Sequence, residues 1–271
     1  MRANTDRTAA LDFGELADHY DAGRIAQTPQ YVSRTVARLG TSASGRLLEV
    51  GAGTGQLTGA LLAAGSDVVA VEPAQRLAER LEQNYRSYGA SGQLRICTQL
   101  FETLQPADFE PFEQIWSSDA WHWIDPAAGY RLAAELLAPG GLLICSWRYP
   151  VLTDVDLQAR LNAVYSRLSP DLIRDPEAHV AELEPLQEQG RREVSESGHM
   201  TTIDHWTEEH LMDISVESYA ELQLSFAQIA ALSTGQRGQL AESILDVAGP
   251  GRVGVSLAIW QYTVASRPAD R

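Results

Sequence analysis

Short apolar runs alternate with amphipathic stretches along the first half of the chain, which is the pattern of a parallel α/β sheet. Runs such as GRLLEV and DVVAVEP are short, and glycine or proline marks one end of each, so each predicts a buried strand. Between these runs, apolar residues recur at helical spacing. The expected strands are 45–50, 67–73, 93–99, 112–118 and 140–147, and the expected helices are 55–65, 74–88 and 125–138.

The pattern changes after Pro150, where charged amphipathic stretches replace the short apolar runs. Thr207 and Ser215 have side chains typical of helix N-caps, so a helix is expected after each of them. The simplest architecture is one Rossmann-like domain with a helical insertion over about 150–198 that covers the site. The other expected elements are helices over 154–168, 176–189 and about 236–248, and strands over 199–206 and 252–266.

Composition places the chain among ordinary globular proteins. It has 271 residues, of which 44% are hydrophobic and 21% are charged. The net charge of −15 repels phosphate backbones and anionic bilayers, so neither nucleic acid nor a membrane is expected as a partner. All 21 basic residues are arginine. The absence of lysine from the sequence excludes Schiff-base lysine chemistry and a Walker-type phosphate site.

Cysteine and histidine usage predicts no metal site and no disulfide framework. Cys97 and Cys145 are far apart and sit in apolar runs, which favours two reduced thiols. The histidines lack metal-ligand spacing, and no serine lies in a GxSxG motif. The sequence has no apolar segment typical of a signal peptide or a membrane span, so a cytoplasmic location is expected.

The strongest motif is the segment LLEVGAGTG, in which three glycines follow a predicted strand and open a predicted helix. Gly51, Gly53 and Gly55 let the backbone turn sharply and let a ligand lie against it. The next predicted strand ends near Glu72, whose carboxylate can accept two hydrogen bonds from a ribose diol. Together these features predict a site for a cofactor that contains a nucleoside.

The spacing of the glycines argues against a dinucleotide. Dinucleotide sites use G-x-G-x-x-G/A, in which a third small residue allows close helix packing beside the pyrophosphate. That position holds Gln56 here, and Glu49 lies just before the first glycine, where a carboxylate is unfavourable beside a pyrophosphate. S-adenosylmethionine, which has an ammonium group and no phosphate, suits this loop. A nicotinamide oxidoreductase is the less favoured alternative.

With these motifs the chain resembles the class I S-adenosylmethionine-dependent methyltransferases of the type 11 family. LLEVGAGTG, VVAVEP, LFETL, SSDAWHWIDP and LLAPGGLLICSW stand where that family places its motifs. The resemblance covers 13–147 and returns at 217–226 and 251–267. It implies an α/β fold with a Rossmann-like, doubly wound, seven-stranded sheet, mostly parallel with an antiparallel final strand. The whole chain, 1–271, would then be one methyltransferase domain. Its parts would be an N-terminal helical entry segment (1–44), a cofactor-binding core (45–148), a helical acceptor lid (150–198) and a C-terminal part completing the sheet (199–271).

The resemblance also implies a role for each part of the cofactor site. The methionine part would lie against Glu49 and the glycine loop, and Glu72 would hold the ribose hydroxyls. Arg24 matches an arginine that approaches the methionine carboxylate in the family. The family often has an acid at the position of Leu100 to accept from the adenine amino group, and this chain departs from that pattern. The implied cofactor-binding residues are Tyr20, Arg24, Glu49, Gly51, Ala52, Gly53, Gln56, Glu72, Pro73, Leu100, Phe101, Glu102, Ser117, Ser118, Asp119 and Trp121.

An aromatic segment, SSDAWHWID, follows the fourth expected strand and should lie at the ligand edge of the sheet. Asp119 or His122 could act there as a base or as a positioning group. Trp121 or Trp123 could offer a ring face to the sulfonium. Buried structural roles are the alternative for these residues, and the favoured one for His122.

The expected activity is methyl transfer by in-line displacement to a small-molecule acceptor through an O, N or C nucleophile. The family resemblance includes tailoring enzymes of secondary metabolism. The arginines between 148 and 192 would suit an anionic acceptor. Two alternatives remain open: cyclisation chemistry with the same cofactor, including ring formation from the cofactor itself, and a nonenzymatic module that binds the cofactor. The chain could act as a monomer or a homodimer.

Overall fold

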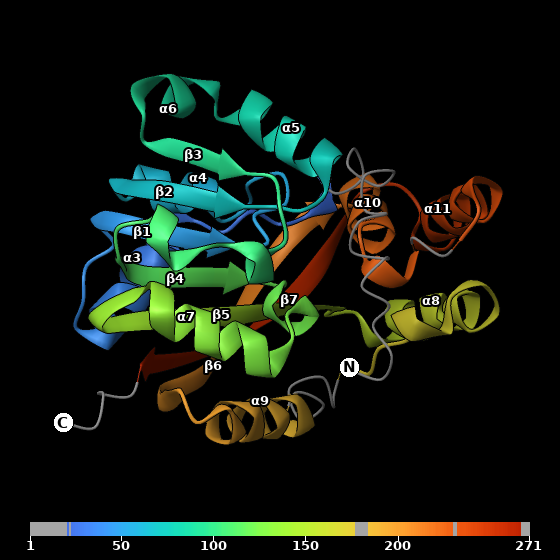
Figure 1. Ribbon diagram of the computed structural model, residues 1–271. Coiled ribbons are helices and arrows are strands. Elements are labelled where there is room, and N and C mark those ends of the chain that lie inside the picture. Colours follow the sequence, from blue (N-terminus) through green and yellow to red (C-terminus); the bar gives the residue numbers. More distant parts are fainter. Residues whose placement is uncertain (1–20, 22, 177–183, 230–231, 267–271) are drawn as a thin grey trace.

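A computed structural model describes residues 21, 23–176, 184–229 and 232–266. Its centre is a seven-stranded sheet in the order β3-β2-β1-β4-β5-β7-β6 (Figure 1). The first five strands run parallel, and β7 is antiparallel to both of its neighbours, which confirms the predicted fold class. The strands are β1 (Gly45–Val50), β2 (Ser66–Val71), β3 (Leu94–Cys97), β4 (Phe112–Ser118), β5 (Leu137–Leu152), β6 (Met200–Ser215) and β7 (Arg252–Ser266).

Helices pack on both faces of this sheet, as a doubly wound fold requires. One core contains the apolar sides of α3 (Pro29–Leu39), α4 (Thr58–Ala63) and α5 (Gln75–Asn84), which is followed by α6 (Arg86–Ser91). The opposite core lies under α7 (Pro126–Leu136) and α9 (Glu184–Ser197). Both faces are therefore covered, which explains why β1 and β2 read as continuous apolar runs in the sequence.

The strands β5, β6 and β7 are much longer than the other four and continue past the ends of the parallel strands. A third apolar core forms on this extension. It joins the extension to α8 (Val155–Leu168), α10 (Val216–Leu224) and α11 (Thr234–Ala248). We call this unit the helical lobe. It stands on the side to which the parallel strands point (Figure 1), so it flanks the edge at which α/β sheets bind ligands.

The structure corrects several predicted boundaries in the second half of the chain. Thr207 does not begin a helix, because it lies within β6 opposite Trp260 of β7. The predicted strand therefore runs on to Ser215, whose side chain does cap α10 by accepting from the backbone N–H of Ser218. The helix expected over 176–189 is α9, which ends at Ser197. The predicted strand 140–147 is the middle of the longer β5.

The two described helices of the predicted insertion pack in different places, and its role as an acceptor lid stays a prediction. Helix α8 belongs to the helical lobe and contacts α11, whereas α9 packs against α7 and β6. In the part of the chain that the structure describes, no helix is both long and apolar enough to cross a bilayer.

Ile244 and its neighbour Leu245 test whether the helical lobe is integral to the folded protein. Ile244 is fully buried in the third core, whereas Leu245 is 38% exposed on the same helix. We expect Ile244→Ala to lower the free energy of unfolding by about 2–5 kcal/mol, because it leaves a cavity. Leu245→Ala should cost less than about 0.5 kcal/mol. Urea unfolding measures both values, and equal small losses would show that the lobe contributes little to stability.

Candidate functional site

The glycine loop lies between β1 and α4, at the carboxyl end of the central strands. Gly51, Gly53 and Gly55 all have left-handed φ angles, of 72°, 58° and 104°. A Cβ at Gly51 would overlap the side chain of Ala120, in the loop after β4. The loop after β1 thus runs directly against the loop after β4, and a residue other than glycine would force them apart.

Glu72 follows β2 and holds the glycine loop from the side. One carboxylate oxygen accepts from the backbone N–H of Gly53 and the other accepts from that of Ala74, both at 2.9 Å. Burial raises the pKa of Glu72 to about 7, against the lowering effect of these two hydrogen bonds. Each oxygen has a second lone pair, so the geometry leaves acceptor capacity for a ribose diol while the loop is held.

A second buried carboxyl, Glu49 of β1, belongs to the same site. Its Oε2 accepts from the hydroxyl of Thr58 at 2.6 Å. Burial raises its pKa to about 8; the Thr58 hydrogen bond acts to lower it, and the charge of Glu72 adds to the rise. Because the charge of Glu72 acts against ionisation of the buried Glu49, this pair favours a neutral carboxyl or a bound cation. The pair of buried carboxyl groups therefore fits a ligand that carries positive charge, and does not fit a pyrophosphate.

Asp119 forms a buried ion cluster at the end of β4. It has a left-handed φ of 57°, the only such angle among described residues other than glycine. Its Oδ1 accepts from the backbone N–H of Arg148 at 2.8 Å, and its Oδ2 accepts from Nε of Arg148 at 2.7 Å and lies 2.6 Å from Nη2. Nη1 of Arg24 lies 3.5 Å from the same oxygen. Arg148 is thus a buried residue of β5 that pairs with Asp119 and does not belong to an acceptor lid.

This cluster makes Asp119 a poor base. Burial acts to raise the pKa of Asp119, but the charges of Arg148 and Arg24 outweigh it, and the pKa lies below its usual value. Arg24 also donates to the carbonyl oxygen of Ser225 at 3.2 Å and lies over the ring of Phe226. Asp119 therefore connects the loop after β4 with β5, the N-terminal segment and the helical lobe, which is the behaviour of a positioning group.

His122 is held by a neighbouring indole. Its Nδ1 lies 3.0 Å from Nε1 of Trp147. Because an indole N–H can only donate, Nδ1 must be the acceptor, and the neutral ring carries its proton on Nε2. Trp121 is 1% exposed and packs between Phe101 and Tyr130, with ring centroids 5.5 Å from each. Both side chains thus have packing or hydrogen-bonding partners within the protein, and their expected roles at the site stay predictions.

Other residues expected at the cofactor site lie around the same edge of the sheet. Leu100 is 43% exposed at the start of the turn that carries Phe101 and Glu102, which fits a border of an adenine pocket. Oε1 of Glu102 accepts from the backbone N–H of Asp125 at 3.2 Å. Ser118 has a buried hydroxyl with no hydrogen-bond partner at the end of β4. Such an unpaired buried group suits a site that a ligand completes.

Most of the remaining expected residues belong to the loops of the site or hold them in place, and one lies outside the described residues. Ala52 is buried in the glycine loop, and Pro73 follows Glu72. Ser117 donates to the carbonyl oxygen of Val50 at 3.0 Å, which ties β4 to β1. The side-chain amide of Gln56 donates to the hydroxyl of Thr54. Tyr20 lies outside the described residues, so its expected role stays a prediction.

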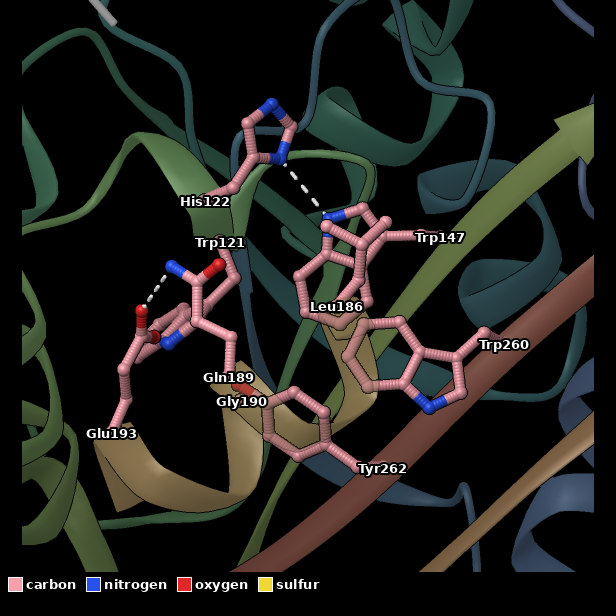
Figure 2. Close-up of a pocket in the computed structure, with 9 residues that line it drawn as sticks. All are labelled: Trp121, His122, Trp147, Leu186, Gln189, Gly190, Glu193, Trp260 and Tyr262. Atoms are coloured by element: carbon pink, nitrogen blue, oxygen red, sulfur yellow. Dashed lines mark hydrogen bonds between the residues drawn. The ribbon is translucent and has the colours of Figure 1, made fainter. Parts of the chain in front are cut away.

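Sequence reasoning missed an aromatic pocket beside this edge. The rings of Trp147, Trp260 and Tyr262 pack together, with the first two stacked at a centroid distance of 4.6 Å. Figure 2 shows them facing α9 across a pocket. The volume of this pocket, including its open mouth, is about 430 Å³. The pairing register of two strands brings these rings together, because Trp147 of β5 lies directly opposite Trp260 of β7. The pocket is lined by Trp121, His122, Trp147, Leu186, Gln189, Gly190, Glu193, Trp260 and Tyr262.

Comparison with known proteins agrees with this geometry. A protein family model described as a methyltransferase domain matches residues 48–145, the segment that carries β1 to β5 and the glycine loop. Uncharacterized methyltransferases of Mycobacterium tuberculosis and Mycobacterium bovis are 32% identical over 145 residues, which is 52% of this chain and 54% of each relative. The chain thus spans about half the length of the curated relatives it matches.

A solved structure shows the same fold over nearly the whole chain. It is a protein of Anaeromyxobacter dehalogenans proposed to be a type II methyltransferase, with 14% identity and a TM-score of 0.60, covering 89% of this chain and 97% of that one. At this identity the likeness establishes the fold alone. Residues 48–145 therefore match a methyltransferase-domain model, and the sheet order of the chain agrees with that match.

Proposed function

We propose that this chain is an S-adenosylmethionine-dependent methyltransferase that acts on a small-molecule acceptor. The observation that carries the proposal is the glycine loop after β1, held by the buried Glu72 and backed by a second buried carboxyl, Glu49. The match of residues 48–145 to a methyltransferase-domain model supports it. A role in secondary metabolism is part of the proposal and rests on the resemblance to tailoring enzymes.

The residues around the loop fit S-adenosylmethionine in charge and shape. Glu72 would hold the ribose hydroxyls, and the backbone of the glycine loop would lie against the cofactor. Glu49 would face the positively charged methionine part, where its negative form is balanced. When bound, the cofactor supplies an electrophilic methyl group on its sulfonium sulfur.

The chain itself contributes alignment more than proton transfer. Asp119 is ionised and occupied by two arginines, and the Nδ1 lone pair of His122 is occupied by Trp147. Neither group is arranged to take a proton from an acceptor. Displacement at a methyl group needs mainly in-line positioning and exclusion of water. The helical lobe flanks the ligand edge of the sheet, where it would exclude water and carry part of the acceptor site.

Glu72 gives the first test of the cofactor site. We expect Glu72→Ala to weaken S-adenosylmethionine binding by about 1.5–3 kcal/mol, roughly 10- to 150-fold, because it removes charged acceptors and loosens the loop. Glu72→Gln should lose less, since it keeps one carbonyl acceptor. Glu79→Ala on the exposed side of α5 is the matched control. Isothermal calorimetry measures all three, and unchanged affinity of Glu72→Ala would refute the ribose assignment.

The raised pKa of Glu49 predicts a pH dependence of cofactor binding. In the free protein this carboxyl is protonated below about pH 8. A positively charged ligand favours the ionised form, so the pKa falls on binding and a proton is released between the two values. Affinity should therefore rise between pH 6 and pH 8 and level off above pH 8. Calorimetry in two buffers of different ionisation enthalpy should show proton release, and Glu49→Gln should reduce it. Proton uptake would contradict the assignment.

Substitution of Asp119 tests whether this residue acts as a general base or as a positioning group. Asp119→Asn leaves two buried arginines without their counter-charge, so the free energy of unfolding should fall by about 3–5 kcal/mol. Under conditions where the variant is folded, the pH profile of turnover should keep its shape. A variant that unfolds at the same urea concentration as the wild type, yet loses about 100-fold or more in turnover, would instead identify a base. Asp67→Asn, on an exposed position of β2, is the control.

A further inference from the structure

The aromatic pocket lies on the acceptor side of the proposed methyl-transfer site. Its upper wall is formed by Trp121 and His122, directly after the loop that Asp119 anchors at the end of β4. Another wall includes Trp147, which is adjacent in sequence to Arg148, the partner of Asp119. The pocket is therefore next to the reacting edge of the sheet and separated from the glycine loop by the 119–123 segment.

The wall on β5 and β7 is a slab of aromatic rings. Trp147 and Trp260 stack with an interplanar angle of 19°, and Tyr262 lies 5.5 Å from each of them. Gly190 of α9 faces this slab, and a Cβ there would lie 3.3 Å from Trp260 and 3.4 Å from Tyr262. Glycine in a helix interior is unfavourable relative to alanine. At this position its missing side chain keeps α9 close to the rings without filling the space beside them.

The charged residue on the opposite wall is an acid. Among the described residues that line the pocket, Glu193 is the only one with a formal charge besides a protonated histidine, and none is an arginine. Its Oε1 accepts from the side-chain amide of Gln189 at 2.9 Å, as Figure 2 shows. The negative charge of Glu193 acts on residues around the pocket. Burial raises the pKa of Tyr130, whose ring packs on Trp121, and the charge of Glu193 adds to that rise.

This combination has a definite electrostatic preference. The faces of aromatic rings carry negative potential and attract cations, most strongly for tryptophan. A carboxylate opposite the rings adds to that attraction, and the net charge of −15 on the chain acts in the same direction. A carboxylate or phosphate would meet rings and an acid and find no arginine among the described lining residues. Two of the arginines that suggested an anionic acceptor have other partners: Arg191, which lines an adjoining pocket beside Trp260 and Tyr262, pairs with Glu188, and Arg174 lies over Tyr149.

We propose that the pocket between α9 and the Trp147–Trp260–Tyr262 slab binds the ammonium group of a cationic acceptor, with Glu193 as its counter-charge. This inference rests on the proposed function for the identity of the bound molecule as an acceptor. The binding preference itself rests only on the residues of the pocket.

Three probes of nearly the same shape test the charge preference. Choline carries a trimethylammonium group, 3,3-dimethylbutan-1-ol replaces its nitrogen with carbon, and 3,3-dimethylbutanoate is an anion of similar size. Titrations followed by tryptophan fluorescence or calorimetry, with saturating S-adenosylhomocysteine, give their affinities. We expect choline to bind at least tenfold more tightly than the alcohol, and the anion to bind most weakly. Equal or tighter binding of the alcohol or the anion, or no binding of choline, would overturn the proposal.

Two substitutions locate the effect in this pocket. Glu193→Gln should weaken choline binding about fivefold or more and change alcohol binding by less than twofold. Glu196→Gln removes the same charge from an exposed position of α9 and should leave both affinities unchanged. Trp147→Leu should weaken choline binding at least as much, provided that circular dichroism shows a folded protein. Equal effects of Glu193→Gln and Glu196→Gln would mean that only the overall charge of the chain matters, and would refute the pocket.

A separate titration with S-adenosylhomocysteine distinguishes this inference from the proposed function. If the protein binds choline selectively but does not bind S-adenosylhomocysteine, the proposed function fails and the cation pocket stands. If it binds S-adenosylhomocysteine but not choline, the proposed function stands and the cation pocket fails.

Discussion

The burial of one carboxylate between two arginines holds the site of this protein together. Asp119 ends β4 in a left-handed conformation, pairs with Arg148 of β5 through backbone and side chain, and lies within ion-pair distance of Arg24. A buried ion cluster of this kind adds little net stability compared with apolar packing, but removing one member is costly because the others remain charged. Its contribution is geometric, because it fixes the loop that separates the glycine loop from the aromatic pocket.

Three acids at the same edge of the sheet are kept in different states by their surroundings. The arginines keep Asp119 ionised, whereas burial pushes the pKa values of Glu49 and Glu72 towards neutrality. The side of the site with Glu49 and Glu72 is therefore ready to exchange a proton for a cationic ligand, while the side with Asp119 is insensitive to pH in the physiological range. The same residue type serves opposite purposes, and only the neighbours distinguish them.

Much of this arrangement could be predicted from sequence because it depends on local signals. Strands β1 and β4 coincide with their predicted bounds, since each is a short apolar run and β1 begins at Gly45. The order of strand, glycine loop, helix and acid pointed to the cofactor side. The capping role of Ser215 was also readable, because an N-cap bonds a residue three positions ahead.

The other features depend on partners that are distant along the chain. Thr207 looked like a helix start because its side chain is typical of an N-cap. In the folded protein Glu208 pairs with Arg34 and Asp204 pairs with Arg38, both from α3, and the segment is a strand. The pairing of His122 with Trp147, and that of Asp119 with Arg148, span 25 and 29 residues. The aromatic pocket forms only when β5 and β7 pair in register, and no local sequence pattern predicts that register.

The length of β5, β6 and β7 limits how the protein can move. These strands run without interruption from the central sheet into the helical lobe, where Val255 of β7 still pairs with Leu152 of β5 and with Met212 of β6. Two bodies that share one hydrogen-bonded sheet cannot rotate about a hinge as two domains joined by a loop can. Opening of the ligand edge must therefore come from helices shifting on a fixed sheet, or from loops, and the distance between the cofactor loop and the lobe stays nearly constant. Such a rigid frame suits a reaction whose rate depends on the alignment of two bound molecules.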